Sequence, residues 1–245
     1  IIEVSTFRAK PNKKEIMANG IEKDNAYGTL IEDAERRDFT ANSIYYDPIN
    51  HKFFDLYDGI KDIKNKQLCV IGSPEIRFKE DPVRILRAIR FSAKLALKIE
   101  PKTRKILNTR INLLDNIPYS RLFDEIMKLF LTGHAVKSFH LFNEFNLSQK
   151  FFPMLQTQDQ STKKFLIQGL KNTDKRIQDN KSINPGFLLA VFLWKDICIA
   201  SEKRQKTSIN ETVALNYAID QVLSKQSKLF PIQKRFSVTM SEIWR

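Results

Sequence analysis

The spacing of apolar residues predicts helices over most of the chain after Pro74. Leu122, Ile126 and Phe130 recur at intervals that place them on one face of a helix. Gly133 interrupts this pattern, because glycine is a poor helix former. The spacing then resumes, and it predicts further helices at residues 136–145, 162–170, 184–199, 211–223 and 233–244.

The segment before Pro74 has a different pattern. Residues 1–7 (IIEVSTF) are rich in β-branched residues and predict a strand. Residues 29–46 look helical and lead into turn-forming residues at 47–50. Short strands are expected at residues 52–56 and 68–71. The pattern as a whole therefore indicates an α+β fold that is predominantly helical.

The segment between Asp81 and Pro101 predicts a helix with two unlike faces. Asp81 is expected at the N-cap and Pro82 at the first helical position. The apolar face would contain Ile85, Leu86, Ile89, Ala93 and Ala96, and the opposite face would contain Arg84, Arg87, Arg90, Lys94 and Lys98. A solvated face usually mixes acidic and basic residues for i,i+4 pairing. Because this stripe is purely basic, it favours an anionic partner over a merely solvated face.

The charge balance of the chain points the same way. The 245 residues include 41 Lys and Arg against 28 Asp and Glu, and the formal net charge is +13. Residues 60–110 contain 14 basic and five acidic side chains and account for most of that excess. Nucleic acid is the expected partner, with an acidic lipid surface as the weaker alternative.

Composition and motifs exclude several classes of protein. The longest apolar run, GFLLAVFLW at 186–194, has about half of the roughly 20 residues that a membrane span needs. Cys69 and Cys198 are too far apart for a zinc ribbon or a CxxC pair, and a reducing cytoplasm is the expected location. Glycine is scarce, and neither GxGxxG nor GxxxxGK[ST] occurs. A glycine-rich phosphate loop is therefore not expected.

Residues 32–42 (EDAERRDFTAN) form the densest polar cluster. Carboxylates bind hard cations and arginine binds phosphate as a fork, so these residue types could hold a metal ion, a sugar hydroxyl and a phosphate together. The alternative is an exposed helix with ion pairs such as Asp33–Arg37.

A second cluster, residues 80–84 (EDPVR), places Asp81 and Arg84 three residues apart. A carboxylate beside a guanidinium can read a nucleobase edge, because an exocyclic amine donates to the carboxylate and a ring nitrogen accepts from arginine. The alternative is that Asp81 caps the helix and Arg84 pairs with it.

The two clusters, in this order, resemble a known family. DAERRDFTANSIYYD (33–47), DLYDGIKDI (55–63) and IGSPEIRFKEDPVRILRAIRFSAKL (71–95) are similar to the class II nucleotidyltransferases that add nucleotides to RNA 3′ ends. This family comprises bacterial poly(A) polymerases and CCA-adding tRNA nucleotidyltransferases. NIPYSRLFDEIMKLF (116–130) and INPGFLLAVFLW (183–194) favour the poly(A) polymerase branch.

The resemblance implies a function and a set of partners. The expected activity is template-independent RNA 3′-end adenylyl transfer from ATP with release of pyrophosphate, in RNA polyadenylation and decay. The partners would be ATP, an RNA 3′ end and two Mg²⁺ ions, with no membrane. The alternatives are CCA addition to tRNA, or a non-catalytic basic helical module that binds RNA.

The resemblance also implies roles for individual residues. Asp38 would be the catalytic, metal-binding aspartate, and Arg37 would contact the nucleotide. Asp81 and Arg84 would read the incoming base, with adenine N6 donating to Asp81 and Arg84 donating to N1. The residues expected to contact RNA phosphates are Arg87, Arg90, Lys94 and Lys98. Arg121 and Glu125, in another helix, would support the base-reading helix.

The expected organisation follows the family. Residues 1–75 would form part of a mixed-sheet nucleotidyltransferase head, residues 76–135 a helical neck and residues 136–245 a helical RNA-binding body. The family's DxD metal ligands do not occur in the sequence. We therefore expect a fragment that lacks the N-terminal part of the head and the basic C-terminal tail, and that is inactive alone.

Overall fold

The computed structural model describes residues 4–9, 26–155, 159–206 and 210–245. The strand predicted at residues 1–7 begins outside these residues. Its described part, residues 4–7, does not form a strand, and the next residue, Arg8, forms an isolated antiparallel bridge with Tyr27.

The N-terminal region joins short helices to two small sheets. Strands β1 (Ile44–Asp47) and β2 (Lys52–Asp55) form an antiparallel hairpin in which Tyr45 pairs with Phe54. β3 (Gln67–Leu68) and β4 (Lys98–Ile99) form a parallel pair. The helical elements of this region are α1 (Leu30–Arg36), the 3₁₀ turn η1 (Thr40–Asn42) and α2 (Gly59–Lys64).

One expectation for this region needs correction and another is confirmed. The helix predicted over residues 29–46 ends at Arg36, and its last residues form β1 instead. Ile44, Tyr45 and Tyr46 are β-branched or aromatic and favour a strand that pairs with β2. The turn at residues 47–50 is confirmed, and the Asp47 carboxylate stabilises it by accepting the N–H groups of Ile49 and Asn50.

A helical region follows the head. Its elements are α3 (Pro74–Glu80), α4 (Arg84–Leu95), α5 (Pro101–Arg110), the 3₁₀ turn η2 (Ile111–Asn116), α6 (Tyr119–Phe130) and α7 (Ala135–Glu144). The helix predicted from Asp81 to Pro101 is shorter, because Ala96 adopts a left-handed conformation that ends α4. Ala96 is therefore exposed, and Lys98 lies on β4 rather than on the helix. The other expected apolar residues of α4 are buried, as predicted.

The C-terminal region is helical throughout its described part. It contains α8 (Leu147–Phe151), the 3₁₀ turn η3 (Pro153–Leu155), α9 (Gln160–Gln178), α10 (Pro185–Phe192), α11 (Trp194–Gln205), α12 (Glu211–Leu229) and α13 (Lys234–Trp244). The helix predicted at residues 184–199 is divided at Leu193 into α10 and α11. None of the helices in these described stretches has the length and hydropathy that a membrane crossing requires.

Phenylalanine rings form much of the core between α6 and the C-terminal helices. Phe130 packs edge-on against Phe142 and Phe192, and Phe152 contacts both Phe192 and Phe230. All five side chains are fully buried. Burying aromatic rings of this size stabilises the junction between the middle of the chain and its C-terminal helices.

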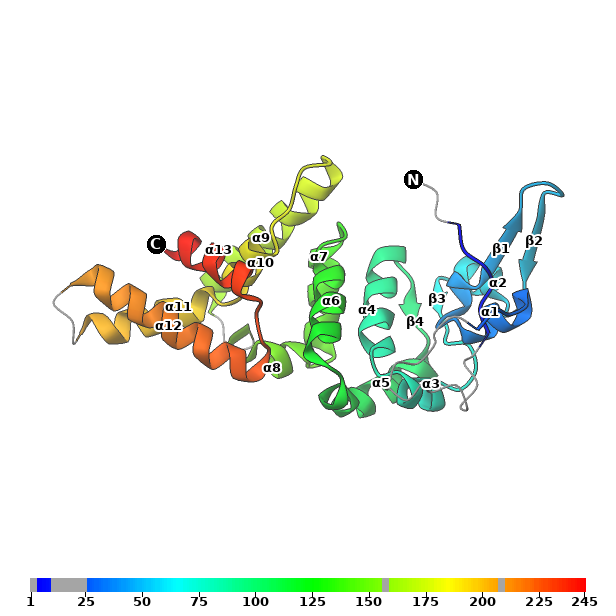
Figure 1. Ribbon diagram of the computed structural model, residues 1–245, viewed down its shortest axis with the longest axis horizontal. Helices are drawn as coiled ribbons and strands as arrows, with labels where there is room; N and C mark the ends of the chain where they lie inside the picture. The colour runs from blue at the N-terminus through cyan, green and yellow to red at the C-terminus, as the bar shows by residue number, and fades with distance from the viewer. Residues whose placement is uncertain (1–3, 10–25, 156–158, 207–209) are drawn as a thin grey trace.

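Figure 1 shows an elongated molecule with the head at one end, α3 to α7 in the middle and α8 to α13 at the other end. The predicted α+β, predominantly helical class is confirmed. The proposed domain boundaries at residues 75 and 135 stay predictions.

Candidate nucleotide-binding site

Asp33 organises the first polar cluster. Its carboxylate is almost completely buried and accepts hydrogen bonds from Arg36 (2.7 Å), Arg37 (Nε, 3.0 Å) and the Tyr45 hydroxyl (2.7 Å). Burial alone would raise the pKa of Asp33, but these hydrogen bonds outweigh it and hold the pKa well below its usual range. The predicted Asp33–Arg37 ion pair is therefore confirmed.

This network fixes Arg37 at the surface. Its Nη1 donates to the carbonyl of Asn42 (3.0 Å), and its guanidinium stacks over the Tyr45 ring. The side chain is still 40% exposed, so one side of a positioned guanidinium faces solvent. Such an arginine suits an anionic ligand, because less side-chain entropy is lost on binding.

The backbone that carries Asp38 is held from several sides. The Asp38 carbonyl accepts the N–H of Ile71 (3.1 Å), and the Thr40 N–H donates to the carbonyl of Cys69 (3.0 Å). The Thr40 hydroxyl donates to Asp62 of α2 (2.7 Å). Gly59 lies so close to Thr40 that an added Cβ would fall 2.3 Å from its carbonyl oxygen. Glycine is therefore required there, and the RRDFT segment is held between α2 and the residues that follow β3.

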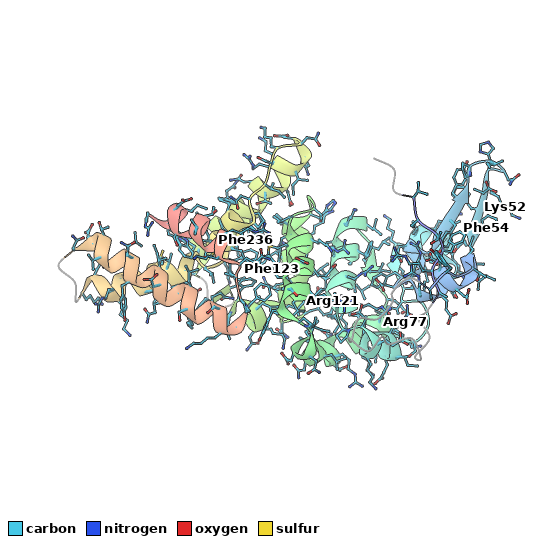
Figure 2. The ribbon with its side chains drawn as sticks, viewed as in Figure 1. Lys52, Phe54, Arg77, Arg121, Phe123 and Phe236 are labelled. Atoms are coloured by element: carbon cyan, nitrogen blue, oxygen red, sulfur yellow. The ribbon has the colours of Figure 1, made fainter. Side chains whose placement is uncertain are left out.

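Arg77 was not among the predicted site residues, yet it is a buried element of this region (Figure 2). Its Nη2 donates to the carbonyls of Arg36 (2.9 Å) and Arg37 (2.6 Å), and its Nη1 pairs with Glu80 (3.0 Å). The last carbonyls of a helix have no partner within the helix. Arg77 therefore caps the C-terminal end of α1, one residue before Asp38. Its only sequence signal is the i,i+3 spacing to Glu80, which an ordinary helix ion pair also has.

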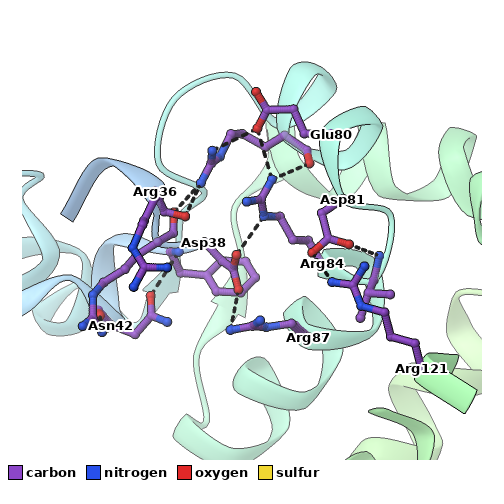
Figure 3. Close-up of polar contacts among 12 residues, drawn as sticks. Arg36, Asp38, Asn42, Glu80, Asp81, Arg84, Arg87 and Arg121 are labelled. Carbon is purple, nitrogen blue, oxygen red and sulfur yellow. Dashed lines mark hydrogen bonds and ion pairs between the residues drawn. The ribbon is translucent and has the colours of Figure 1, made fainter. Parts of the chain in front are cut away.

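Asp38 faces two arginines of α4 (Figure 3). Its carboxylate pairs with Arg84 Nε (2.7 Å) and with Arg87 Nη2 (2.7 Å), and the side chain is only 6% exposed. Arg84 Nη1 also donates to the carbonyl of Arg77 (2.9 Å) and to Glu80 (3.2 Å). These contacts join the RRDFT segment to the EDPVR segment, which lies more than 40 residues further along the chain.

The suggested pairing of Asp81 with Arg84 is wrong. Asp81 lies in the loop before α4, where its Oδ1 accepts the N–H of Val83 (3.2 Å) and its Oδ2 accepts Arg121 (2.7 Å). It is not the N-cap, because α4 begins at Arg84 and Val83 precedes it. Arg84 turns toward Asp38 instead, so Asp81 and Arg84 each have a separate partner.

The basic stripe on α4 is less free than its sequence indicates. Arg84 and Arg87 pair with Asp38, and Arg90 pairs with Glu125 of α6 (3.4 Å). Of the basic residues on this helix, Lys94 is exposed, whereas the three arginines are half-buried. The acidic partners, Asp38 and Glu125, come from other elements. A stripe without acidic residues in the sequence can therefore still have its arginines in ion pairs. Arg121 pairs with Asp81 of the EDPVR segment, and Glu125 pairs with Arg90 further along α4. The supporting role of these two residues stays a prediction.

The residues present do not form a metal site by themselves. A divalent ion of the magnesium type takes several oxygen ligands, but both oxygens of Asp38 face guanidinium groups. Within the described ranges, no three His, Cys, Asp or Glu side chains are grouped as metal ligands. Metal binding by Asp38 stays a prediction.

Family models match three parts of the chain. Residues 1–69 match the poly A polymerase head domain, residues 96–158 a probable RNA and SrmB-binding site of polymerase A, and residues 207–245 the polymerase A arginine-rich C-terminus. The last match corrects the expectation that nothing of this C-terminal segment is present. Its described residues form α12 and α13.

Curated relatives match along the whole chain. Poly(A) polymerase I of Haemophilus influenzae is 36% identical over 100% of the chain, and that of Escherichia coli O6:H1 is also 36% identical over 100% of it. The chain covers 57% and 56% of the lengths of these two relatives. A CCA-adding enzyme of Lactobacillus helveticus is 36% identical over 49% of the chain.

Solved nucleotidyltransferase structures share the fold. A CCA-adding enzyme with CTP aligns with 88% of the chain, covering 47% of its own length, at a TM-score of 0.59 and 21% identity. A tRNA nucleotidyltransferase with a primer tRNA and an ATP analogue aligns with 89% of the chain and 70% of its own, at a TM-score of 0.58 and 22% identity. The architecture is thus that of a nucleotidyltransferase head with its helical extension. The chain belongs to the poly(A) polymerase family, which is related to the CCA-adding enzymes.

Proposed function

We propose that this chain is part of a template-independent RNA 3′-end adenylyltransferase. In this reaction the RNA 3′-hydroxyl attacks the α-phosphorus of ATP, a new phosphodiester bond forms and pyrophosphate leaves. The observation that carries the proposal is the junction of the RRDFT and EDPVR segments through Asp38, Arg84 and Arg87. The full-chain identity to poly(A) polymerases supports it.

Asp81 and Arg84 are proposed to read the adenine base. Each Asp81 oxygen accepts one hydrogen bond, whereas a carboxylate oxygen has two lone pairs, so capacity remains for the adenine N6 amine. Arg84 uses Nε and Nη1, and within the described residues its Nη2 makes no hydrogen bond. That group is therefore available to donate to adenine N1. Base reading would not require the Asp38 contact to break.

Arg37 and Asp38 are proposed to act at the triphosphate and ribose of the nucleotide rather than at its base. Arg37 offers an exposed, positioned guanidinium to the triphosphate or ribose. Asp38 holds Arg84 and Arg87 against the RRDFT segment. We expect AMP transfer to depend on the Asp38 carboxylate. The chemistry consists mainly of positioning the reacting groups and stabilising charge. Mg²⁺ as cofactor and a cytoplasmic location are part of the same proposal.

The RNA strand is proposed to pass along the basic residues near α4. Lys94 and Lys98 are exposed and suit direct contacts with phosphates. Arg87 and Arg90 are engaged by Asp38 and Glu125, so they would contribute positive charge to the same surface while holding the helix in place. The match of residues 96–158 to a probable RNA-binding site supports this path.

CCA addition is the second candidate, because cytosine presents an amine and an acceptor that resemble the adenine edge. The two functions separate in a primer-extension assay. We expect the full-length gene product to add long A tails to an oligo(A) primer with ATP, and not to require CTP. Restoration of CCA on a tRNA that lacks it, followed by a stop, would contradict the proposal and establish the second candidate. The same assay with the 245-residue chain should give no extension.

A further inference from the structure

A cavity lies at the C-terminal end of α9, outside the site described above. It has a volume of about 730 Å³, is open to solvent on one side, and is lined by the last turns of α9 and the segment from Asp179 to Phe187 that leads into α10. Small-molecule and cofactor sites typically have volumes of about 300–1,000 Å³. The space is therefore large enough for one nucleotide.

The walls of this cavity are held in place by the neighbouring helix. The Asp174 carboxylate accepts the N–H groups of Ala135 (2.6 Å) and Val136 (3.2 Å) and thereby caps α7. Gly133 has a φ of +84°, and an added Cβ would lie 3.3 Å from Ile177. The end of α9 is thus fastened to the beginning of α7.

The lining combines positive charge with an aromatic ring. Lys175, Arg176 and Lys181 line the cavity together with one acidic residue, Asp179, which pairs with Lys181 at 3.3 Å. Arg176 Nε donates to the carbonyl of Ser182 (2.9 Å), so its guanidinium is held at the rim.

Phe187 lines the same cavity and is 37% exposed, and the half-buried Ile183 lies beside it in the lining. Sites for single-stranded nucleic acid combine these two features, with cations for phosphates and aromatic faces on which bases stack.

The cavity also lies on the same edge of the molecule as the end of the base-reading helix. α4 packs against α6 and α7, and α7 packs against α9. Figure 1 shows the C-terminal ends of α4, α6 and α9 along the upper edge of the view. Exposed Lys94 lies at the end of α4. The EDPVR segment lies at the opposite, N-terminal end of α4, so a strand that runs along α4 from this segment to Lys94 arrives at the edge that carries the α9 cavity.

We propose that the α9 cavity is a subsite for single-stranded RNA, which holds one nucleotide upstream of the 3′ end. Its base stacks on Phe187, and its phosphates lie against Lys175 and Lys181. The subsite rests on the proposed function for its place in the reaction. RNA binding at the cavity can nevertheless be tested without any activity.

The test compares variants of the 245-residue chain in binding a fluorescent single-stranded oligo(A), followed by fluorescence anisotropy at several salt concentrations. The variant Lys175→Ala/Lys181→Ala should weaken binding at least fivefold and reduce the salt dependence, because phosphate contacts release counterions. Phe187→Leu should weaken binding about fivefold or more with the salt dependence unchanged, because it removes stacking only. The matched control is Lys163→Ala/Lys164→Ala, which removes the same charge from the other end of α9.

Equal binding by the cavity variants and the control variant would overturn the subsite, as would absence of oligo(A) binding by the unmodified chain. ATP alone should not displace the oligonucleotide, and displacement by ATP would mean that the cavity binds a free nucleotide instead. In the full-length gene product, the cavity variants should raise the KM for a long oligo(A) primer and leave kcat unchanged. If the cavity variants lose RNA binding but the full-length product adds no AMP, the subsite stands and the proposed function fails.

Discussion

Replacing Arg77 by alanine should destabilise the head more than any exposed charge substitution in α3. Arg77 is buried, and it donates to two carbonyls at the end of α1 while pairing with Glu80. Hydrogen bonds to a charged group contribute about 1.5–3 kcal/mol each. Allowing for relaxation and water entry, we expect a loss of about 3 kcal/mol for Arg77→Ala. Arg77→Lys should recover part of it, because an ammonium keeps the charge but not the planar fork.

Hydrogen exchange is the suitable assay, because Trp194 and Trp244 both lie in the C-terminal region and their fluorescence does not report on the head. The amides of Thr40 and Ile71 donate across the RRDFT segment and report on its opening. A loss of about 3 kcal/mol corresponds to exchange roughly a hundredfold faster at these amides.

The control is Lys79→Ala, which lies in the same helix and removes an exposed i,i+4 pair with Glu75. Such pairs contribute about 0.3–0.5 kcal/mol, so exchange should change by less than threefold. If Arg77→Ala also changes exchange by less than threefold, the capping of α1 by Arg77 is refuted.

Three further predictions concern selectivity and pH. In the full-length gene product, Arg84→Ala should lower the ratio of kcat/KM for ATP to that for CTP by about tenfold, since a paired base edge contributes about 1–3 kcal/mol. An unchanged ratio would show that Arg84 does not read the base and serves only to pair with Asp38. Burial raises the pKa of Asp196 to about 6, although Lys225 opposes the shift. Its ionisation therefore costs stability as pH rises from about 4 to 6, and urea unfolding at pH 7 should show Asp196→Asn to be more stable by about 1 kcal/mol; equal stability at pH 7 would contradict this. Asp33 has a lowered pKa, so its contribution is complete above about pH 4 and is lost as pH falls further. Asp33→Asn should lower the free energy of unfolding of the head at pH 7. The variant should also lose less of this free energy than the unmodified chain when the pH falls below about 4. The same pH dependence in both proteins would contradict the Asp33 network.

Helix periodicity predicted the helical regions well, since their cores are built from residues close in sequence. The apolar positions of α4 and α6 are buried as their spacing indicates. The end of α4 was harder to predict. Helices commonly end at a glycine or asparagine in the left-handed conformation, but here an alanine, Ala96, adopts it. β4 has only two residues, and its partner β3 lies about 30 residues earlier, so no local pattern indicates the strand.

The sequence pointed to the RRDFT and EDPVR segments, which the structure brings together, but it did not indicate their contacts. The sequence suggested Asp81 as the partner of Arg84, whereas the structure pairs Arg84 with Asp38, 46 residues away. Asp38 and Glu125 also pair with Arg87 and Arg90, and these pairs neutralise part of the positive charge on α4. Arg77 was missed because its i,i+3 spacing to Glu80 is typical of an ordinary helix ion pair, and no sequence pattern indicates its hydrogen bonds to the carbonyls of Arg36 and Arg37. Ion pairs between distant elements depend on the tertiary fold, and the charge pattern along one helix does not predict them.

The most direct test of the central claim measures AMP transfer from ATP to an oligo(A) primer by the full-length gene product, with and without Asp38→Ala. We predict ATP-dependent tails for the unmodified protein and at least a hundredfold lower rate for the variant. Hydrogen exchange and circular dichroism should show that the variant is still folded. Transfer at the unmodified rate by folded Asp38→Ala would contradict the assignment of the site, and the absence of transfer by the unmodified protein would contradict the proposed function itself.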